Sequence, residues 1–516
     1  MSKRSTIPAP FRRRALAAAL ALALAPTAQA GDWRDKATPH LQAQAKSGAP
    51  IDVLIVLRGD PALRLLDRSQ PRAARAKAVA DSLQSLAMSS QAGLLAELDA
   101  RGIAYRPLWI ANAVAARMDA TDLAFIGARD DVLRLHSDRQ FVADLPTADP
   151  LQPKGAKLIE PNITHVRAPE AWALGFRGQG VVVGAQDTGY QWDHPAVRNR
   201  YRGWNGTAAS HAYHWHDAIH GLLGAGVNSC GVNSAVPCDD NGHGTHTLGT
   251  VLGDDGAGNQ VGVAPDAQWI ACRNMERGNG RPSTYIECFQ FFLAPTDAAG
   301  QNPNPALAPD MITNSWGCPV GPPPAGEDCA LESFDTTLGA LRAAGILVVV
   351  AAGNGSASCG SINTPPAISA DVFTVGSTTN SDAISSFSLT GPVTVDGSNR
   401  IKPDLMAPGS SVRSAFRGGG YGTISGTSMA TPNVAGVAAL VMSANPALRG
   451  EPEAVEAILR ETAVRLNPPG LDCPGFLSTA YPNHIYGYGR VDALAAVQLA
   501  LLSVPLFDDG FEVQAQ

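Results

Sequence analysis

Several common signatures are missing from this sequence. No cysteine occurs before Cys230 and no C-x-x-C pair occurs anywhere, which argues against zinc-ribbon or thioredoxin-like chemistry. The H-E-x-x-H arrangement of metal-binding helices is also absent. Charged residues make up only 16% of the chain, the net charge is −7, and no long basic stripe follows the first residues. Nucleic acid is therefore not an expected partner.

Long apolar runs are lacking too. The run Ala15–Leu24 is far shorter than the roughly 20 residues that span a bilayer, which disfavours an N-terminal membrane anchor, and no other segment is apolar enough. It follows the basic residues Arg12–Arg14 and precedes the small-x-small sequence Ala28-Gln29-Ala30. Residues 1–30 are therefore predicted to be a secretory signal. The protein is expected to be secreted, with retention in a periplasm as the alternative.

All eight cysteines lie in the later part of the chain, at positions 230, 238, 272, 288, 318, 329, 359 and 473. In an exported protein an even number of cysteines favours disulfides. Proximity suggests the pairs 230–238, 272–288 and 318–329, although connectivity does not follow from sequence and some thiols are left open as free.

Residues 31–150 read as a separate small unit. Their apolar pattern predicts elements in the order β-α-β-β-α-β, a split βαβ arrangement. The expected elements are Asp52–Leu57, Arg72–Arg101, Ile103–Pro107, Ala113–Met118, Asp119–Arg129 and Val132–His136. The unit holds no grouping of catalytic residue types, so a small binding domain is its generic interpretation. The Pro- and Asp-rich stretch Asp144–Lys157 is predicted to be an exposed linker open to cleavage.

From residue 151 to about 500, strand-like and helix-like segments alternate. The predicted strands are continuously apolar, which indicates burial on both faces and hence a parallel sheet covered by helices, an α/β fold. They are Val181–Ala185, Ala267–Cys272, Met311–Asn314 and Ile346–Ala352. The stretches Gln301–Pro309 and Pro319–Cys329 are predicted to be surface loops.

The stretch Gly426–Pro432 precedes an Ala-rich run, Asn433–Ala444, that predicts a buried helix. Pro432 is expected in the first turn, where a missing N–H costs little. Ser428 then lies at a helix N-terminus, whose N–H groups favour a developing oxyanion. An ordinary helix cap is the competing interpretation.

Three further polar groups follow or begin predicted elements. Asp187 follows a strand, at the sheet edge where open α/β sheets bind ligands, although an Asp near a glycine also forms turns. His243 lies between glycines at a predicted helix start, and with His246 it offers a less favoured metal site. Asn354 ends the strand beginning at Ile346 and supplies either an oxyanion donor or an Asn-Gly turn. Together with Ser428 they supply an acid, a base, a nucleophile and an oxyanion donor, in the chain order Asp, His, Ser.

These blocks carry a family resemblance. Gln186–Gly189, Asn241–Thr247 and Gly426–Pro432 resemble the three signature blocks of the subtilisin-like serine proteases, the subtilases, over roughly residues 165–500. Four further stretches resemble the bacillopeptidase F branch: Trp192–Pro195, Phe292–Asp297, Asn314–Gly317 and Ile401–Asp404.

The resemblance implies a three-layer α/β fold and a secreted endopeptidase acting on proteins and peptides. It implies that Ser428 attacks the peptide carbonyl, His243 acts as base, Asp187 orients His243, and Asn354 with the Ser428 N–H holds the oxyanion. The residues implied to contact substrate are Ser315, Trp316, Gly317, Ala351, Ala352 and Gly353. Residues 31–150 then correspond to an inhibitory propeptide that assists folding and is removed by self-cleavage, 151–500 to the catalytic domain, and 501–516 to a short acidic tail. A monomer is expected.

The chain also departs from the family. Asn433 replaces a frequent His of the serine block, a position outside the triad. Ala196 stands where many relatives have a calcium-binding Asp, so calcium at the loop Gly253–Gln260 is left open. No cofactor is required for the chemistry and no metal ligand is assigned. For the tract His211, His214, His216 and His220, a solvent-facing insertion loop is favoured over a metal site.

Two other functions compete with an endopeptidase. An esterase with Ser428, Asp472 and His484 has the right chain order, but Ala430 replaces the second glycine of its G-x-S-x-G turn. A catalytically dead scaffold is disfavoured because all four chemical positions are filled.

Overall fold

The computed structural model describes residues 32–143, 145–146, 158–224, 226–318, 329, 331–466 and 470–503. The expected secretory signal, most of the linker Asp144–Lys157 and of the loop Pro319–Cys329, and the acidic tail from residue 504 onward lie outside these residues. None of the described helices combines the length and the apolar character that a membrane crossing requires.

The N-terminal unit has the predicted split βαβ order. Its antiparallel sheet has the strand order β2-β3-β1-β4. The elements are α1 (Pro39–Ala45), β1 (Ile51–Leu57), α2 (Arg72–Ala100), β2 (Tyr105–Leu108), β3 (Ala113–Met118), α3 (Ala120–Gly127) and β4 (Val132–Ser137). The Asp119 carboxylate caps α3 by accepting from the Thr121 and Asp122 amides.

The larger unit is built on one parallel sheet, as the continuous apolar runs predict. Its seven strands have the order β16-β15-β14-β13-β7-β10-β8, and every neighbouring pair is parallel. The strands are β7 (Val182–Asp187), β8 (Trp215–Asp217), β10 (Gln268–Arg273), β13 (Met311–Asn314), β14 (Leu347–Ala351), β15 (Phe373–Thr378) and β16 (Leu405–Pro408). The sequence analysis missed β8, β15 and β16, because short runs such as Leu-Met-Ala-Pro carry little periodicity.

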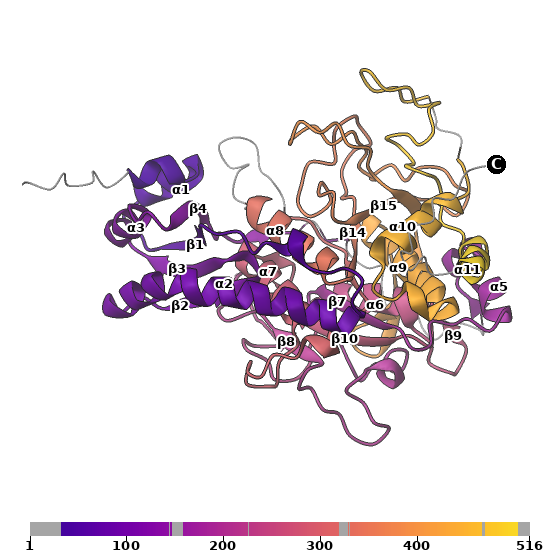
Figure 1. Ribbon diagram of the computed structural model, residues 1–516. Coiled ribbons are helices and arrows are strands. Elements are labelled where there is room, and N and C mark those ends of the chain that lie inside the picture. The colour runs from indigo at the N-terminus through magenta and orange to yellow at the C-terminus, as the bar shows by residue number, and fades with distance from the viewer. Residues whose placement is uncertain are drawn as a thin grey trace, which may run out of the picture.

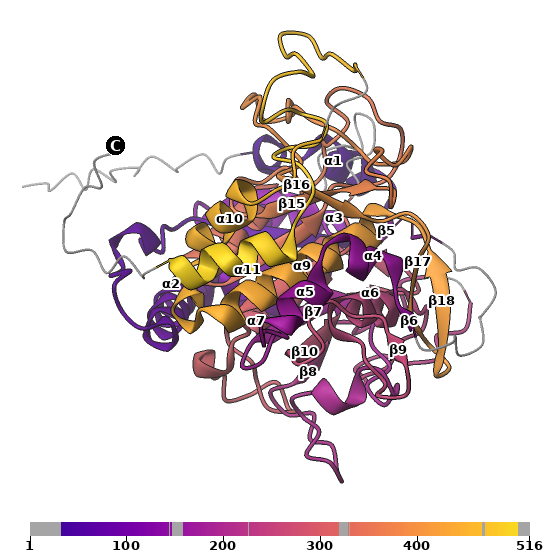
Figure 2. The ribbon, with the colours of Figure 1, turned by 90° about the vertical axis from the view of Figure 1, so that its right-hand side faces the viewer.

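Helices cover both faces of this sheet. Successive residues of β10 point to opposite faces, so Trp269 and Ala271 belong to one core and Ile270 and Cys272 to the other. The first core includes residues of α4 (Pro161–His165), α5 (Ala168–Ala173), α6 (His243–Leu252), α9 (Thr427–Ala444), α10 (Pro452–Glu461) and α11 (Ala493–Leu502), several of which lie in front in Figure 2. The second includes α7 (Pro282–Leu293) and α8 (Leu331–Ala343).

The N-terminal sheet packs onto α7 and α8. Leu54, Val56, Ala113 and Ala115 belong to the same buried cluster as those helices. In Figure 1 the N-terminal unit lies at the left, and α2 runs from it along the larger unit. The two units therefore share one apolar interface.

Short pairings complete the fold. They are β5 (Phe141–Val142) with β12 (Asn279–Gly280), β12 with β11 (Met275–Glu276), β6 (Leu158–Ile159) with β9 (Asn259–Gln260), and β17 (Val412–Phe416) with β18 (Gly420–Ile424).

All eight cysteines, each within the described residues, form disulfides. The pairs 230–238, 272–288 and 318–329 confirm the predictions made from proximity. The fourth, Cys359–Cys473, joins residues 114 positions apart and had no local signal.

Candidate active site

Asp187 and His243 meet at the carboxyl edge of the parallel sheet. Asp187 is the last residue of β7 and His243 the first of α6. His243 Nδ1 lies 2.8 Å from Asp187 Oδ1 and 3.0 Å from Oδ2. Because an ionised carboxylate only accepts hydrogen bonds, Nδ1 is the protonated nitrogen and Nε2 of the neutral ring keeps its lone pair. Nε2 is buried and has no hydrogen-bond partner within the described residues, so it is poised as a base.

Asp239 positions the helix that carries His243, a role the sequence analysis missed. Its Oδ1 accepts from the Asn241 and Gly242 amides and the Thr188 hydroxyl, and its Oδ2 accepts from the amide and hydroxyl of Thr245. Gly242 has φ +110°, and a side chain there would collide with Phe416. The only sequence signal was an Asp a few residues before a helix start.

Ser428 lies at the same sheet edge, in the first turn of α9. Its hydroxyl donates to the Ser315 carbonyl at 2.9 Å, and Ser315 directly follows β13, the strand beside β7. The structure thus brings Ser428 beside the strand ends that hold Asp187, but its hydroxyl is turned to Ser315 and not to His243.

The expectation that Pro432 lies in the first turn was wrong. The helix α9 starts at Thr427, so Pro432 is an interior residue. A proline there cannot donate to the carbonyl four residues earlier, which belongs to Ser428. The Ser315 hydroxyl donates to that carbonyl at 2.9 Å and replaces the missing bond.

Asn354 lies beside the start of α9. Its Oδ1 accepts from the Thr427 amide at 2.9 Å and from the Thr427 hydroxyl at 3.1 Å. These two donors fix the amide orientation, so that Nδ2 is left to donate elsewhere. A Cβ built on Gly426 would lie 3.6 Å from Nδ2, which places this donor next to the Ser428 turn.

The expected substrate-binding residues border the same edge. Ser315, Trp316 and Gly317 follow β13, while Ala351 ends β14 and leads to Ala352 and Gly353. The Trp316 side chain is buried and stacks on Tyr285 with ring centroids 4.1 Å apart. A ligand at the sheet edge can therefore contact the backbone of Trp316 but not its ring.

Known proteins match this arrangement over most of the chain. The sequence pattern described as the subtilase family matches residues 178–489, which contain the entire parallel sheet and the residues placed above. The chain belongs to the subtilase family. Its domain has the three-layer α/β fold expected for that family.

Named relatives support the same assignment. This subtilase is 38% identical to bacillopeptidase F from Bacillus subtilis over 348 residues, which are 66% of this chain and 22% of that protein. It is 38% identical to alkaline serine exoprotease A from Vibrio alginolyticus over 228 residues, 44% of this chain and 36% of that protein. Subtilisin DY from Bacillus licheniformis is 31% identical over 346 residues, 66% of this chain and all of that protein. The subtilase thus spans about a fifth of bacillopeptidase F and about a third of the exoprotease.

The loop Gly253–Gln260 does not present a calcium-ligand set. Asp255 Oδ1 accepts from the amides of Ala257 and Asn259, and its Oδ2 accepts from the side chains of Asn259 and Tyr421. Asp254 Oδ1 accepts from the Gly256 amide. These oxygens serve the loop's own turns, and the loop contributes to no converging group of three acidic, His or Cys side chains in the described chain. The residues present therefore do not fit calcium as arranged here.

The histidine tract is not a solvent-facing insertion, contrary to the expectation. It contains β8, the edge strand of the main sheet, and none of its four histidines is fully exposed. His211 Nδ1 lies 2.9 Å from the Tyr201 hydroxyl, and His216 and His220 both face Glu287 of α7.

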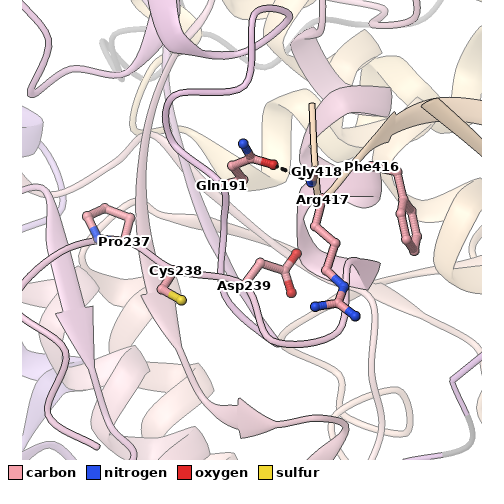
Figure 3. A pocket seen from close by; sticks show the side chains of 7 residues that line it. All are labelled: Gln191, Pro237, Cys238, Asp239, Phe416, Arg417 and Gly418. Atoms are coloured by element: carbon pink, nitrogen blue, oxygen red, sulfur yellow. Dashed lines mark hydrogen bonds between the residues drawn. The ribbon is translucent and has the colours of Figure 1, made fainter. Parts of the chain in front are cut away.

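Two other features stand apart from Ser428. Asp472 accepts from the amide and hydroxyl of Ser478, and the His484 ring packs against Phe476, so nothing supports the esterase pairing. A hollow of about 500 Å³ opens beside the N-terminus of α6 (Figure 3). It is lined by Gln191, Pro237, Cys238, Asp239, Phe416, Arg417 and Gly418. None of the expected catalytic or substrate-binding residues lines it.

Proposed function

We propose that this chain is the precursor of a secreted serine endopeptidase in which Ser428, His243 and Asp187 form the catalytic triad. The Asp187–His243 pair gives this proposal its main support. The Nε2 atom of His243 is buried, has no hydrogen-bond partner among the described residues and faces no competing donor there. An imidazole held in this tautomer by a carboxylate is the base that a serine nucleophile needs.

The proposed reaction follows from these atoms. The Ser428 hydroxyl turns from the Ser315 carbonyl to His243, gives its proton to Nε2, and Oγ bonds to the substrate carbonyl carbon. The developing oxyanion accepts from Asn354 Nδ2 and the Ser428 N–H. When the C–N bond breaks, the leaving amine takes the proton from Nε2. Water then repeats the sequence on the acyl-enzyme and releases the acid.

Substrate backbone is proposed to lie between the ends of β13 and β14, along Ser315–Gly317 and Ala351–Gly353. Gly353 has φ +103°, and a Cβ built there would lie 2.8 Å from the Leu389 side chain. A bare backbone at this point lets a peptide approach closely.

Residues 31–150 are proposed to act as an intramolecular inhibitor that self-cleavage removes, leaving residues 151–500 as the catalytic domain. Strand β5 pairs antiparallel with β12, and the Ala143 amide donates to the Gly278 carbonyl at 2.8 Å. Beyond it, the Leu145 side chain packs against Gly278, and Pro146 Cγ lies 3.4 Å from a Cβ built on Gly426. A strand added to an enzyme edge in this way occupies the space of a peptide substrate. Cleavage is expected within the stretch 144–157.

Secretion by way of the predicted signal is part of this proposal. Four disulfides fit an oxidising compartment. Protein substrates, the chain's own N-terminal unit as the inhibitor, and a monomeric state complete it.

One assay tests the function. The purified chain is incubated with casein, with and without a serine-directed fluorophosphonate, beside Ser428→Ala, Asp187→Asn and His243→Ala. We expect cleavage by the wild type alone, its loss with the fluorophosphonate, and a precursor that stays uncut in the Ser428→Ala variant. N-terminal sequencing of the wild type is expected to begin within residues 145–158. Casein cleavage that survives Ser428→Ala would reject the assignment.

A further inference from the structure

Two imidazoles and one carboxylate converge between β8 and α7, and none of them belongs to the proposed triad. His216 lies on the edge strand β8, His220 follows that strand, and Glu287 lies on α7. His216 Nε2 is 2.8 Å and His220 Nε2 is 2.7 Å from the same oxygen, Glu287 Oε1. Within the described residues, this is the one set of three such side chains whose ligand atoms lie within 4.8 Å of one another.

The hydrogen bonding at this cluster leaves one carboxylate oxygen of Glu287 with only the Arg106 guanidinium, 3.4 Å away, as a neighbouring opposite charge among the described residues. A carboxylate oxygen only accepts, so both Nε2 atoms must carry protons to bond Glu287 Oε1. His220 Nδ1 also forms a hydrogen bond with Asn233 Oδ1. The second carboxylate oxygen, Glu287 Oε2, is buried and accepts no hydrogen bond from the described residues.

We propose that His216, His220 and Glu287 form a binding site for a divalent transition-metal ion of the Zn²⁺ type, and that Arg106 of the N-terminal unit opposes its occupation. Two imidazoles and a carboxylate favour such ions over Ca²⁺ and Mg²⁺, which take oxygen ligands. With a metal bound, each Nε2 offers a lone pair in place of a proton. The Nδ1–H of His220 keeps its bond to Asn233, which holds the ring in the ligating tautomer.

The required rearrangement is small. Ligand atoms about 2.1 Å from a tetrahedral Zn²⁺ lie roughly 3.4 Å apart. The two Nε2–Oε1 distances of 2.8 and 2.7 Å therefore need to open by about 0.6 to 0.7 Å. The side chains of His216 and His220 are 24% and 26% exposed, which leaves an entry path and room for a water as fourth ligand.

Arg106 supplies the coupling to the N-terminal unit. It lies on β2, and its Nε is 3.4 Å from Glu287 Oε2 while its Nη2 donates to the Ser283 hydroxyl at 3.2 Å. A guanidinium at this distance repels an incoming dication and competes for the carboxylate. Metal binding is therefore weaker while the N-terminal unit is docked, and by linkage a bound metal weakens that docking.

The test uses the full-length Ser428→Ala chain, so that neither cleavage nor the proposed activity is needed. After chelator treatment and with calcium present, Zn²⁺ is titrated against a chromophoric competitor, and Co²⁺ absorption reports a tetrahedral site. We expect one Zn²⁺ per chain, bound at least about tenfold more weakly after His216→Asn, His220→Asn or Glu287→Gln. His214→Ala is the matched control, since His214 belongs to the same tract but bonds the Ser210 carbonyl.

Equal Zn²⁺ affinity in the ligand variants and in His214→Ala would overturn the site. Glu287→His, which restores a ligand, is expected to bind Co²⁺ with an altered spectrum, so a chain unfolded by Glu287→Gln does not leave the site untested. For the coupling, Arg106→Ala is expected to tighten Zn²⁺ binding about fivefold or more. Arg64→Ala removes an equal charge paired with Asp60 and is expected to change it less than twofold. Indistinguishable affinities for these two variants would overturn the coupling.

Discussion

At the scale of single residues, the chemistry depends on which atoms are left without partners. Asp187 takes both bonds from His243 Nδ1, and Thr427 takes both bonds of Asn354 Oδ1. What remains is one imidazole lone pair on His243 and one amide donor on Asn354, the latter next to the Ser428 turn. Neighbouring bonds thus decide which atom of each side chain is left for the proposed reaction.

Asn354→Ala removes the proposed side-chain oxyanion donor. We expect kcat to fall about 10²–10³-fold with little change in KM, because this bond strengthens only in the transition state. That magnitude is the one known for a subtilisin that has lost its side-chain oxyanion donor. Steady-state kinetics on a peptide ester checks it. A loss confined to KM would contradict the oxyanion role, and the unfolding temperature controls for damage to the start of α9.

His246 is a buried neutral histidine that ties α6 to the β17–β18 hairpin. Its Nε2 donates to the carbonyls of Val412 and Gly422 at 3.1 Å each. Burial away from water lowers its pKa from 6.5 to about 3, with the nearby His243 adding to the effect. These two bonds engage His246 with main-chain carbonyls of the hairpin, which indicates a structural role.

The depressed pKa of His246 predicts acid sensitivity. Below pH 6.5 the unfolded chain binds a proton at this ring that the folded chain does not, so stability is complete above pH 6.5 and falls as the pH drops towards about 3. One such proton costs about 1.4 kcal/mol of unfolding free energy per pH unit. In the Ser428→Ala background, we expect His246→Gln to be less stable at pH 7 but to lose less stability between pH 6 and pH 4. Urea unfolding at several pH values measures this, and parallel curves for the two chains would refute it.

At the scale of elements, α9 combines a reactive residue with a helix defect. Pro432 withholds the N–H that the Ser428 carbonyl would otherwise accept, and the Ser315 hydroxyl supplies the bond from a neighbouring strand end. The repair also fixes the first turn of α9 against β13. Ser428 is thereby held by two opposite bonds with one residue, since its hydroxyl donates back to the Ser315 carbonyl.

Removing this repair is expected to cost stability. Ser315→Ala leaves a buried carbonyl without its donor, at roughly 1–3 kcal/mol. Pro432→Ala restores a main-chain N–H, so Ser315→Ala should cost clearly less in that background. Chemical unfolding of the single and double variants in the Ser428→Ala chain gives the coupling energy. Strictly additive losses would show that the hydroxyl does not replace the proline's missing bond.

At the scale of the whole molecule, the N-terminal unit is held by more than its sheet. The start of α2 reaches the far side of the larger unit, where Arg72 donates to the carbonyls of Ala308 and Pro309 and pairs with Asp310 at 3.3 Å. Asp310 is fully buried and also accepts from Arg449 and from the Val182 amide. This end of α2 thus anchors the unit at the base of the central strands.

Arg72→Ala is expected to weaken docking by about 2 kcal/mol, the value of hydrogen bonds to a charged group. Hydrogen exchange of β1 in the Ser428→Ala chain should then accelerate roughly 30-fold. Arg68→Ala is the matched control, because Arg68 is exposed and pairs with Glu453 across the same interface at 3.7 Å. The anchor is rejected if both variants exchange at the same rate.

The sequence by itself determined the fold class and pointed to the residues that we propose as reactive. Strands buried on both faces must be continuously apolar, so β7, β10, β13 and β14 could be predicted, and a helix start was expected at His243 between its two glycines. Three disulfides could also be predicted, because cysteines that are close together in the sequence have few other cysteines within reach. These features depend on residues that are neighbours along the chain, and a sequence pattern contains that information.

Only the tertiary structure decided the contacts between distant segments. Several contacts join residues from separate elements. They are the Cys359–Cys473 disulfide, the five hydrogen bonds of Asp239, the bond by which Ser315 replaces the missing donor of Pro432, and the convergence of His216 and His220 on Glu287. The same holds for the orientation of Ser428, whose hydroxyl faces Ser315. Such contacts depend on how a helix packs on a sheet and on which rotamer fits there. Neither can be predicted from the order of residues within a single element.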